Sequence, residues 1–249
     1  MSGHSKWATI KRKKGVTDAK RGQVFTRLAR EIALAAREGG GDAESNFKLR
    51  LAVDKARANN MPKDNIQRAI DRGTGSGEGG ALEQVLYEGY AGHSVALMME
   101  CVTDNRNRAV SDLRRTLTRG GGHLGEGGSV AWQFQRKAYF AFPAEGQDQD
   151  KIFEMAVDAG ADDVQFGEEM IEIFAPVEAF KSVSDRLRAT GINPEEAELR
   201  MEPTNVVELD PGDTVKVMKT IEELEELDDV QKVYSNLHVS DEAVEALAA

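Results

Sequence analysis

The sequence predicts an α+β protein in which a basic N-terminal three-helix domain precedes two ferredoxin-like α/β domains, one inserted in the other. Three observations support this prediction. Apolar residues recur at helical spacing over the first 73 residues, a glycine-rich segment follows, and beyond it strand-like and helix-like apolar runs alternate. The order of these runs indicates how the domains are connected.

Composition limits the classes of protein to consider. The chain has 249 residues, 40% hydrophobic and 30% charged, which is typical of a soluble globular protein with two or three modest domains. No apolar run approaches the roughly 20 residues of a membrane span, and the N-terminus lacks a signal peptide's apolar core. A single cysteine, Cys101, excludes an internal disulfide and a cysteine zinc site. We expect a cytoplasmic protein with no membrane partner.

The first predicted element is an irregular basic arm. Residues 2–15 show neither a helical nor an alternating apolar period, and Met1 to Gly40 hold ten Lys or Arg against three acids. The arm therefore suits a polyphosphate partner. Trp7 either stacks on a base or anchors the arm to its own domain. The candidate nucleic-acid contacts in this region are Lys6, Trp7, Lys11, Arg12, Lys13, Lys14, Lys20, Arg21, Arg27 and Arg30.

Three helices are predicted behind the arm. The first spans residues 24–36 and ends at Gly39 to Gly41, because glycine accepts the left-handed conformation after a last turn. The second covers Asn46 to Asn59. The third starts at Pro62, where a missing N–H costs nothing, and stops at Gly73.

A glycine-rich linker is predicted next. Gly75, Gly77 and Gly80 form a literal G-x-G-x-x-G pattern, but a helix precedes it and a strand follows, the reverse of the order in a dinucleotide site. The glycine stretch 120–128 also follows a helix and precedes a strand. Neither stretch therefore predicts a phosphate loop.

The remaining elements predict the domain arrangement. Residues 82–101 are strand-rich, 106–119 form a helix and 129–134 a strand. The next set is β(138–142) α(147–159) β(163–166) β(170–174) α(177–189) β(197–201), a complete βαββαβ order. The tail adds β(206–209) α(211–227) β(230–239). We therefore expect domains at 1–80, at 81–135 plus 204–249, and at 136–203, the last inserted.

Charge is segregated along the chain. Residues 1–73 hold 17 Lys or Arg and 8 Asp or Glu, a balance of +9, whereas the rest holds 15 and 35, a balance of −20. A nucleic-acid partner must therefore meet the N-terminal domain or a local basic patch.

One such patch is predicted on the helix 106–119. Arg108, Asp112, Arg115 and Arg119 share one arc, opposite Val110, Leu113 and Leu117. One interpretation is a solvated face in which Asp112 pairs with Arg108 and Arg115. The other is an anion-facing patch that binds phosphates.

The sequence gives no sign of a catalytic centre. His4, His93, His123 and His238 are scattered without metal-ligand spacing, and neither a nucleophile elbow nor a Walker loop is present. We predict no catalytic residues, no metal, no cofactor and no small-molecule substrate.

Several motifs resemble the YebC family along nearly the whole chain. They are Gly3-His4-Ser5-Lys6-Trp7, Lys11-Arg12-Lys13-Lys14, Asn59-Asn60-Met61-Pro62-Lys63-Asp64-Asn65-Ile66, Tyr87-Glu88-Gly89-Tyr90, Thr103-Asp104-Asn105-Arg106-Asn107-Arg108, Ser129-Val130-Ala131-Trp132 and Val233-Tyr234-Ser235-Asn236. The resemblance implies the same three-domain arrangement. It also implies either a DNA-binding transcriptional regulator or a ribosome-associated translation factor that relieves stalling, because both descriptions occur in this family.

The functional hypothesis is a non-enzymatic nucleic-acid-binding regulator of gene expression. Lys and Arg on an arm and a helix face neutralise phosphates without reading bases, which suits structured RNA at least as well as an operator. The sequence thus favours ribosomal RNA or tRNA on the ribosome, with DNA-binding transcriptional regulation as the alternative. Two rivals are an acidic adaptor for a basic protein and an enzyme that uses His123 or the arginine patch on a phosphorylated substrate. The oligomeric state stays open.

Overall fold

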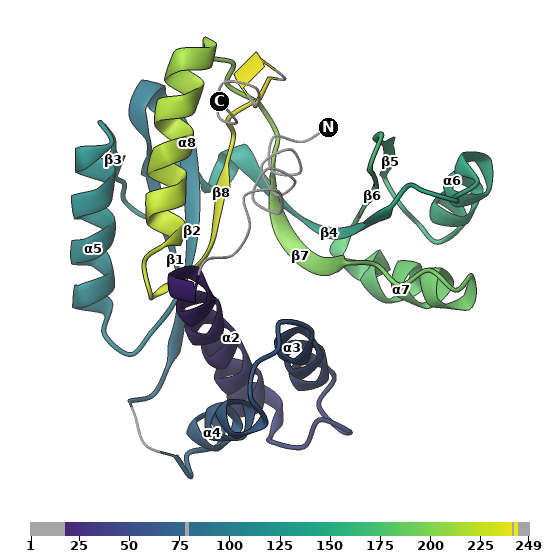
Figure 1. The fold of residues 1–249 in the computed structure, drawn as a ribbon. Coiled ribbons are helices and arrows are strands. Elements are labelled where there is room, and N and C mark those ends of the chain that lie inside the picture. The colour runs from purple at the N-terminus through teal and green to yellow at the C-terminus, as the bar shows by residue number, and fades with distance from the viewer. Residues whose placement is uncertain (1–17, 78–79, 241, 244–249) are drawn as a thin grey trace.

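The computed structural model describes residues 18–77, 80–240 and 242–243 of the chain. These residues form an N-terminal helical part and two four-stranded antiparallel sheets, each covered by helices on one face (Figure 1). The predicted α+β class is confirmed. The boundaries of the three proposed domains stay a prediction.

The described N-terminal part contains the three predicted helices, α2 (Asp18–Gly39), α3 (Phe47–Ala58) and α4 (Lys63–Thr74). Leu28 and Ile32 of α2 and Leu49 of α3 are buried in their common core. Asn46 holds the turn between α2 and α3, because its Oδ1 accepts the N–H of Leu49 and its Nδ2 donates to the carbonyls of Ala35 and Gly40, both at 2.8 Å.

The third helix ends one residue later than the predicted end at Gly73. The helix continues to Thr74, and Gly75, at φ +82°, is the left-handed residue that ends it. A Cβ on Gly73 would lie 2.2 Å from the carbonyl oxygen of Ala33. Gly73 is therefore needed for the close crossing of α4 over α2 and not for a turn.

The first sheet, sheet A, has the order β3-β1-β2-β8. Its elements are β1 (Glu83–Tyr90), β2 (Ala96–Thr103), α5 (Arg106–Arg119), β3 (His123–Leu124), α8 (Pro211–Glu225) and β8 (Val230–Ser235). Helices α5 and α8 lie side by side on one face, where Leu113, Leu117, Ile221 and Leu224 pack on Met99 and Val233.

Two predicted strands around sheet A are wrong. The apolar residues Val130, Ala131 and Trp132 favour a strand over 129–134, but Ala131–Gln133 is a 3-10 turn, η2. The N–H groups of Val130 and Ala131 donate to the Glu88 carboxylate instead of to a strand. Residues 206–209 contribute only an isolated bridge between Val207 and Leu237.

The second sheet, sheet B, follows the predicted βαββαβ order and has the strand order β5-β6-β4-β7, which is ferredoxin-like. Its elements are β4 (Phe134–Pro143), α6 (Gln149–Asp158), β5 (Asp163–Phe166), β6 (Met170–Ala175), η3 (Val177–Ala179), α7 (Phe180–Ala189) and β7 (Glu196–Pro203). Phe140, Phe142, Ile171 and Ile173 form its core with α6 and α7.

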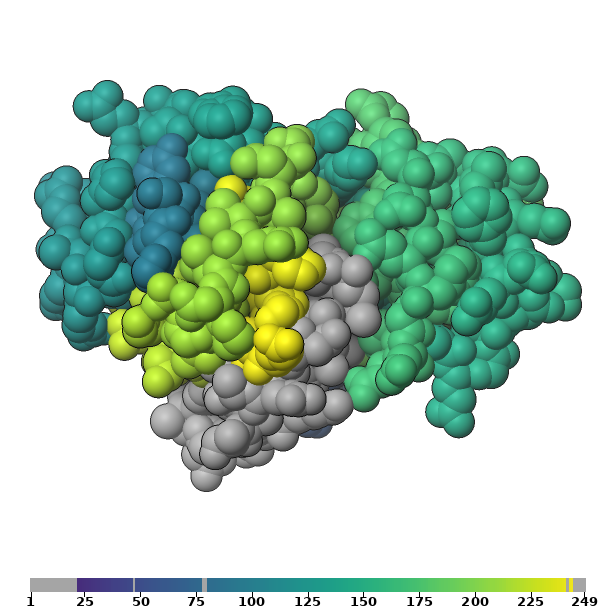
Figure 2. Space-filling model, turned by 90° about the horizontal axis from the view of Figure 1, so that it is seen from above, coloured from purple at the N-terminus to yellow at the C-terminus, as the bar shows by residue number. Residues whose placement is uncertain are grey.

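The two sheets are joined where the chain crosses between them twice. Phe134 at the start of β4 pairs with Pro203 at the end of β7, and Phe134 packs with Met98 and Tyr234 of sheet A. Seen from above, the lobe of α6, α7 and sheet B lies beside the lobe of α5 and α8 (Figure 2). No helix among the described residues is long and apolar enough to span a bilayer.

Candidate nucleic-acid interface

The described residues account for part of the predicted interface. Lys6, Trp7, Lys11, Arg12, Lys13 and Lys14 lie outside them, and Lys20 and Arg21 belong to the first turn of α2. The positions of Arg27, Arg30, Arg108, Arg115 and Arg119 show which basic groups already have partners in the fold.

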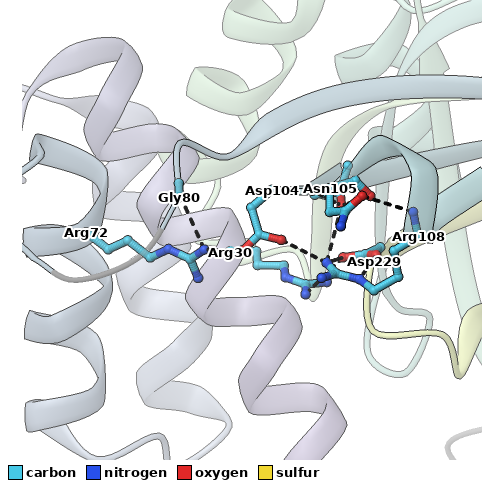
Figure 3. A network of polar contacts seen from close by, with 8 residues as sticks. Arg30, Arg72, Gly80, Asp104, Asn105, Arg108 and Asp229 are labelled. Atoms are coloured by element: carbon cyan, nitrogen blue, oxygen red, sulfur yellow. Dashed lines mark hydrogen bonds and ion pairs between the residues drawn. The ribbon is translucent and has the colours of Figure 1, made fainter.

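Arg30 and Arg108 converge on one buried carboxylate (Figure 3). Asp229 precedes β8 and is only 5% exposed. Its Oδ1 lies 3.0 Å from Nη2 of Arg30 and 2.8 Å from Nη2 of Arg108, and its Oδ2 accepts from Nε of Arg108 at 3.0 Å. The bidentate contact fixes the plane of the Arg108 guanidinium against the sheet.

A second carboxylate extends this network. Asp104 follows β2 and accepts from Nη2 of Arg108 and from Nη2 of Arg72, both at 2.9 Å. Hydrogen bonds from Arg108 hold the pKa of Asp104 below its usual range, and those to Asp229 and Asp104 raise the pKa of Arg108. We call Arg30, Arg72, Asp104, Arg108 and Asp229 the Asp229 anchor, because they tie α2 and α4 to sheet A.

Other polar groups of α2 also face the body. Nη1 of Arg27 donates to the carbonyl of Glu225 at 3.3 Å, and Nε2 of Gln23 donates to that of Glu226 at 3.3 Å. These carbonyls end α8, where the helix dipole favours a cation. Arg27 and Arg30 of α2 and Arg108 of α5 therefore already have partners within the fold.

Helix α5 presents a different, solvent-facing basic surface. A shallow depression of ≈ 680 Å³ is lined by Asn107, Val110, Ser111, Arg114, Arg115, Thr118 and Arg119. Arg115 pairs with Asp112 at 3.0 Å and Arg119 with Glu223 at 2.6 Å, and all but Asp112 of these side chains are more than a third exposed. Such pairs contribute only about 0–1 kcal/mol, so a phosphate competes with them easily. We call Arg114, Arg115 and Arg119 the α5 basic face.

The predicted arc on α5 needs two changes. The spacing predicts that Arg108 pairs with Asp112 or faces an anion, but its partners are Asp104 and Asp229. Val110 is predicted to be buried, whereas Ala109 and Thr116 are buried in its place. Arg114 is not among the predicted contacts, and it is an exposed residue between the apolar and basic positions of the helix.

The described residues offer no metal site. No group of three or more His, Cys, Asp or Glu within them is placed to hold a metal ion. The His123 ring instead stacks on Tyr90 with ring centroids 5.3 Å apart, and His93 Nε2 lies 3.5 Å from Asp213.

The chain matches two family models that together span most of its length. Residues 5–76 match the TACO1/YebC protein N-terminal domain, and residues 82–237 match the TACO1/YebC second and third domain. A probable transcriptional regulatory protein of Roseiflexus castenholzii is 52% identical, with 98% of each chain covered, and one of Rubrobacter xylanophilus is 51% identical over 100% of both chains.

The fold has a solved counterpart. The crystal structure of a conserved hypothetical protein, Aq1575 from Aquifex aeolicus, superposes with a TM-score of 0.82 at 42% identity, covering 90% of this chain and 93% of that one. The family models, the relatives and this structure agree with the predicted resemblance. The chain belongs to the TACO1/YebC family.

Proposed function

We propose that this protein is a nucleic-acid-binding regulator of gene expression that grips the phosphate backbone through its basic N-terminal region. The family is non-enzymatic, and its relatives are named probable transcriptional regulatory proteins. The observation that carries the proposal is charge segregation, because the +9 region stands against a −20 body that repels a polyanion.

The distribution of charge concentrates this role on the arm, because residues 18–73 hold 12 Lys or Arg against 8 Asp or Glu. Lys48 pairs with Glu38, Lys55 with Glu31 and Arg57 with Asp54, and cations of α2 contact the body. Residues 1–17 contain five Lys or Arg and no acid. The arm therefore supplies the largest uncompensated charge, with Lys6, Lys11, Arg12, Lys13 and Lys14 as the proposed phosphate contacts.

DNA is the target that the relatives' names favour. A second candidate, ribosomal RNA or tRNA on a stalled ribosome, is favoured by the contacts that Arg27 and Arg30 of α2 make with the body. A helix held in this way does not present these two cations to a major groove, whereas backbone contacts suit A-form RNA.

The test compares three targets under matched salt. Binding to duplex DNA, to structured RNA and to ribosomes is measured from 50 to 200 mM salt. If about six phosphates are contacted, affinity for the physiological target falls by roughly 10³ over this range. The preferred target is the one that keeps the highest affinity at the upper end.

The arm is tested by charge reversal. Lys11→Glu, Lys13→Glu and Lys14→Glu together should abolish most binding, because the net charge of the arm falls from positive to negative. The matched control changes three exposed lysines of the body to Glu, namely Lys151, Lys181 and Lys219. This control should keep more than half of the wild-type affinity. An equal fall in affinity in both variants would show a nonspecific charge effect and contradict the role of the arm.

A further inference from the structure

Trp132 is an exposed aromatic residue in a rigid turn. It lies in η2 and is 71% exposed, the highest value among the large exposed hydrophobic side chains of the described residues. Its Nε1–H donates to the carbonyl of Ser129 at 3.1 Å. The indole's one polar group is therefore satisfied inside the turn, and most of the ring is left to solvent.

The turn under Trp132 is held from one side by a buried carboxylate. Glu88 of β1 accepts the N–H groups of Gly128 and Val130 at 2.7 Å and of Ala131 at 2.8 Å. Tyr90, two residues further on the same strand, donates its hydroxyl to the carbonyl of Ser129 at 3.0 Å, the same oxygen that receives the Trp132 indole. The ring therefore stands on fixed backbone.

The other side of the turn is held by Gln133. Its carbonyl accepts both the N–H and the hydroxyl of Thr204, and its Oε1 accepts from Asn205 and Asn236. Gln133 is buried next to an exposed Trp132. Rigid support of this kind lowers the entropic cost of binding a flat ligand on the ring.

A second exposed ring, that of His123, lies near the turn of Trp132. Tyr90 links the turn to His123, whose exposed ring stacks on the Tyr90 ring. His123 follows the C-terminal end of α5 by four residues, but Val130 and Ala131 of the turn pack on Ala96 and Met98, on the face of sheet A opposite to α5. Glu126 is an exposed carboxylate of the same loop, so a ligand would be held here by the ring and not by a row of cations.

We propose that Trp132 is a stacking platform for an unpaired nucleobase. Single-stranded sites use exposed aromatic side chains as platforms for bases, and stacking tolerates any base. The inference rests on the proposed nucleic-acid function and adds a preference for unpaired strands. It also separates this surface from the arm, whose proposed contacts are with phosphates.

The first experiment uses Trp132 as its own reporter. The sequence contains two tryptophans, so a Trp7→Phe variant leaves Trp132 as the single tryptophan fluorophore. Titration with a short single-stranded oligoadenylate should quench its emission, because a stacked base contacts the ring face. A fully paired duplex of the same length should quench it far less. Equal quenching by both would overturn the platform.

The second experiment separates stacking from apolar contact. Trp132→Ala should lower affinity for the single strand by about 5- to 100-fold. Trp132→Phe should keep most of the affinity, whereas Trp132→Leu should resemble alanine since it keeps apolar area without a π-face. The matched control is Val206→Ala, at a side chain 57% exposed, which should change nothing. Wild-type affinity in Trp132→Leu would overturn stacking.

Outcomes distinguish this inference from the proposed function. If the arm variant loses nucleic-acid binding but Trp132→Ala binds as well as the unsubstituted protein, the nucleic-acid function stands and the platform fails. If the unsubstituted protein binds no nucleic acid, the proposed function itself fails. If Trp132→Ala abolishes ribosome association while oligoadenylate leaves the fluorescence unchanged, Trp132 contacts a protein and the platform is overturned.

Discussion

The side chain of Glu88 accepts backbone N–H groups of the turn that contains Val130 and Ala131. In the strand predicted for residues 129–134, these groups would have bonded to a neighbouring strand. Burial alone would raise the pKa of this carboxyl, but hydrogen bonds from the N–H groups of Gly128, Val130 and Ala131 outweigh burial and lower the pKa. The charge therefore holds the turn that carries Trp132. A side chain replaces a ladder of backbone bonds.

Glu88→Gln should lower the free energy of unfolding by about 2 kcal/mol, because hydrogen bonds to a charged acceptor are replaced by weaker ones. The melting temperature should fall by roughly 4–8 °C. Glu126→Gln, in the exposed part of the same loop, is the control and should leave it unchanged. A shift in the control as large as in Glu88→Gln would remove the special role of Glu88.

The same substitution has a defined pH dependence. Since the folded pKa of Glu88 is lowered, its contribution is present above the unfolded value of about 4.3 and is lost as the pH falls through the folded value. The difference in stability between wild type and Glu88→Gln should therefore close below about pH 4. Urea titrations at several pH values measure it, and a difference that persists in acid contradicts the charge-based account.

Cys101 lies in the sheet A core and is fully buried, and burial raises the pKa of its thiol to about 12. A protonated, buried thiol is a poor nucleophile. Native protein should react with iodoacetamide only at the rate of unfolding, whereas protein in guanidinium should react at once. Rapid labelling of the native protein would show that β2 opens locally.

Helix α5 carries two sets of arginines with different roles. Arg108→Gln should lower the free energy of unfolding by about 2 kcal/mol, because Asp229 keeps only Arg30 as a charged partner.

The double variant Arg114→Gln with Arg115→Gln should leave the melting temperature unchanged and weaken nucleic-acid binding. The slope of affinity against salt should fall by about 0.9 for each phosphate that the variant no longer neutralises. Stability measurements and salt titrations of both variants, side by side, test the division. A destabilised Arg114 and Arg115 variant would contradict it.

Elements with their own periodicity could be predicted from the sequence. The three N-terminal helices, α5, α8 and the whole βαββαβ order of sheet B each show an apolar repeat within a single segment. The two-residue β3 could not be predicted, because so short a strand has no period. Its pairing with Gly89 and Tyr90 is set by β1.

Predictions failed where the partner is distant in sequence. Helical spacing alone places Arg108 on the outward face of α5, but its guanidinium donates to Asp229, which is 121 residues away in the sequence. In the same way, Val130 resembles a strand residue until the position of Glu88 is known. The exposure of Trp132 could not be predicted either, because an apolar run gives no sign of which side chain faces solvent.

The Asp229 anchor and a small apolar contact together hold the N-terminal helices on sheet A. Ala33 and Leu34 of α2 pack on Leu82 and Val102. The composition of the glycine linker predicts a hinge between the basic domain and the body. These contacts instead favour a docked arrangement in which the arm has a fixed starting point.

Asp229→Asn should loosen this docking without unfolding either sheet. Amide hydrogen exchange in α2 and α4 should accelerate about tenfold for each 1.4 kcal/mol by which docking is weakened, while exchange in sheet B stays unchanged. Asp112→Asn, which removes an exposed carboxylate, is the control. Exchange that rises equally in sheet B would show global destabilisation.

The pairing of Phe134 with Pro203 also bears on how the chain folds during synthesis. Strand β8, the pairing partner of β2, is synthesised last. One edge of β2 therefore stays unpaired while all of sheet B is synthesised. Once sheet B has folded, its two ends are joined, and the effective loop that β2 and β8 must close is roughly half as long. That shortening is worth only about 0.6 kcal/mol by loop entropy. The larger gain is in order of assembly, since a local, already folded unit brings the two halves of sheet A together before a nonlocal pairing has to form.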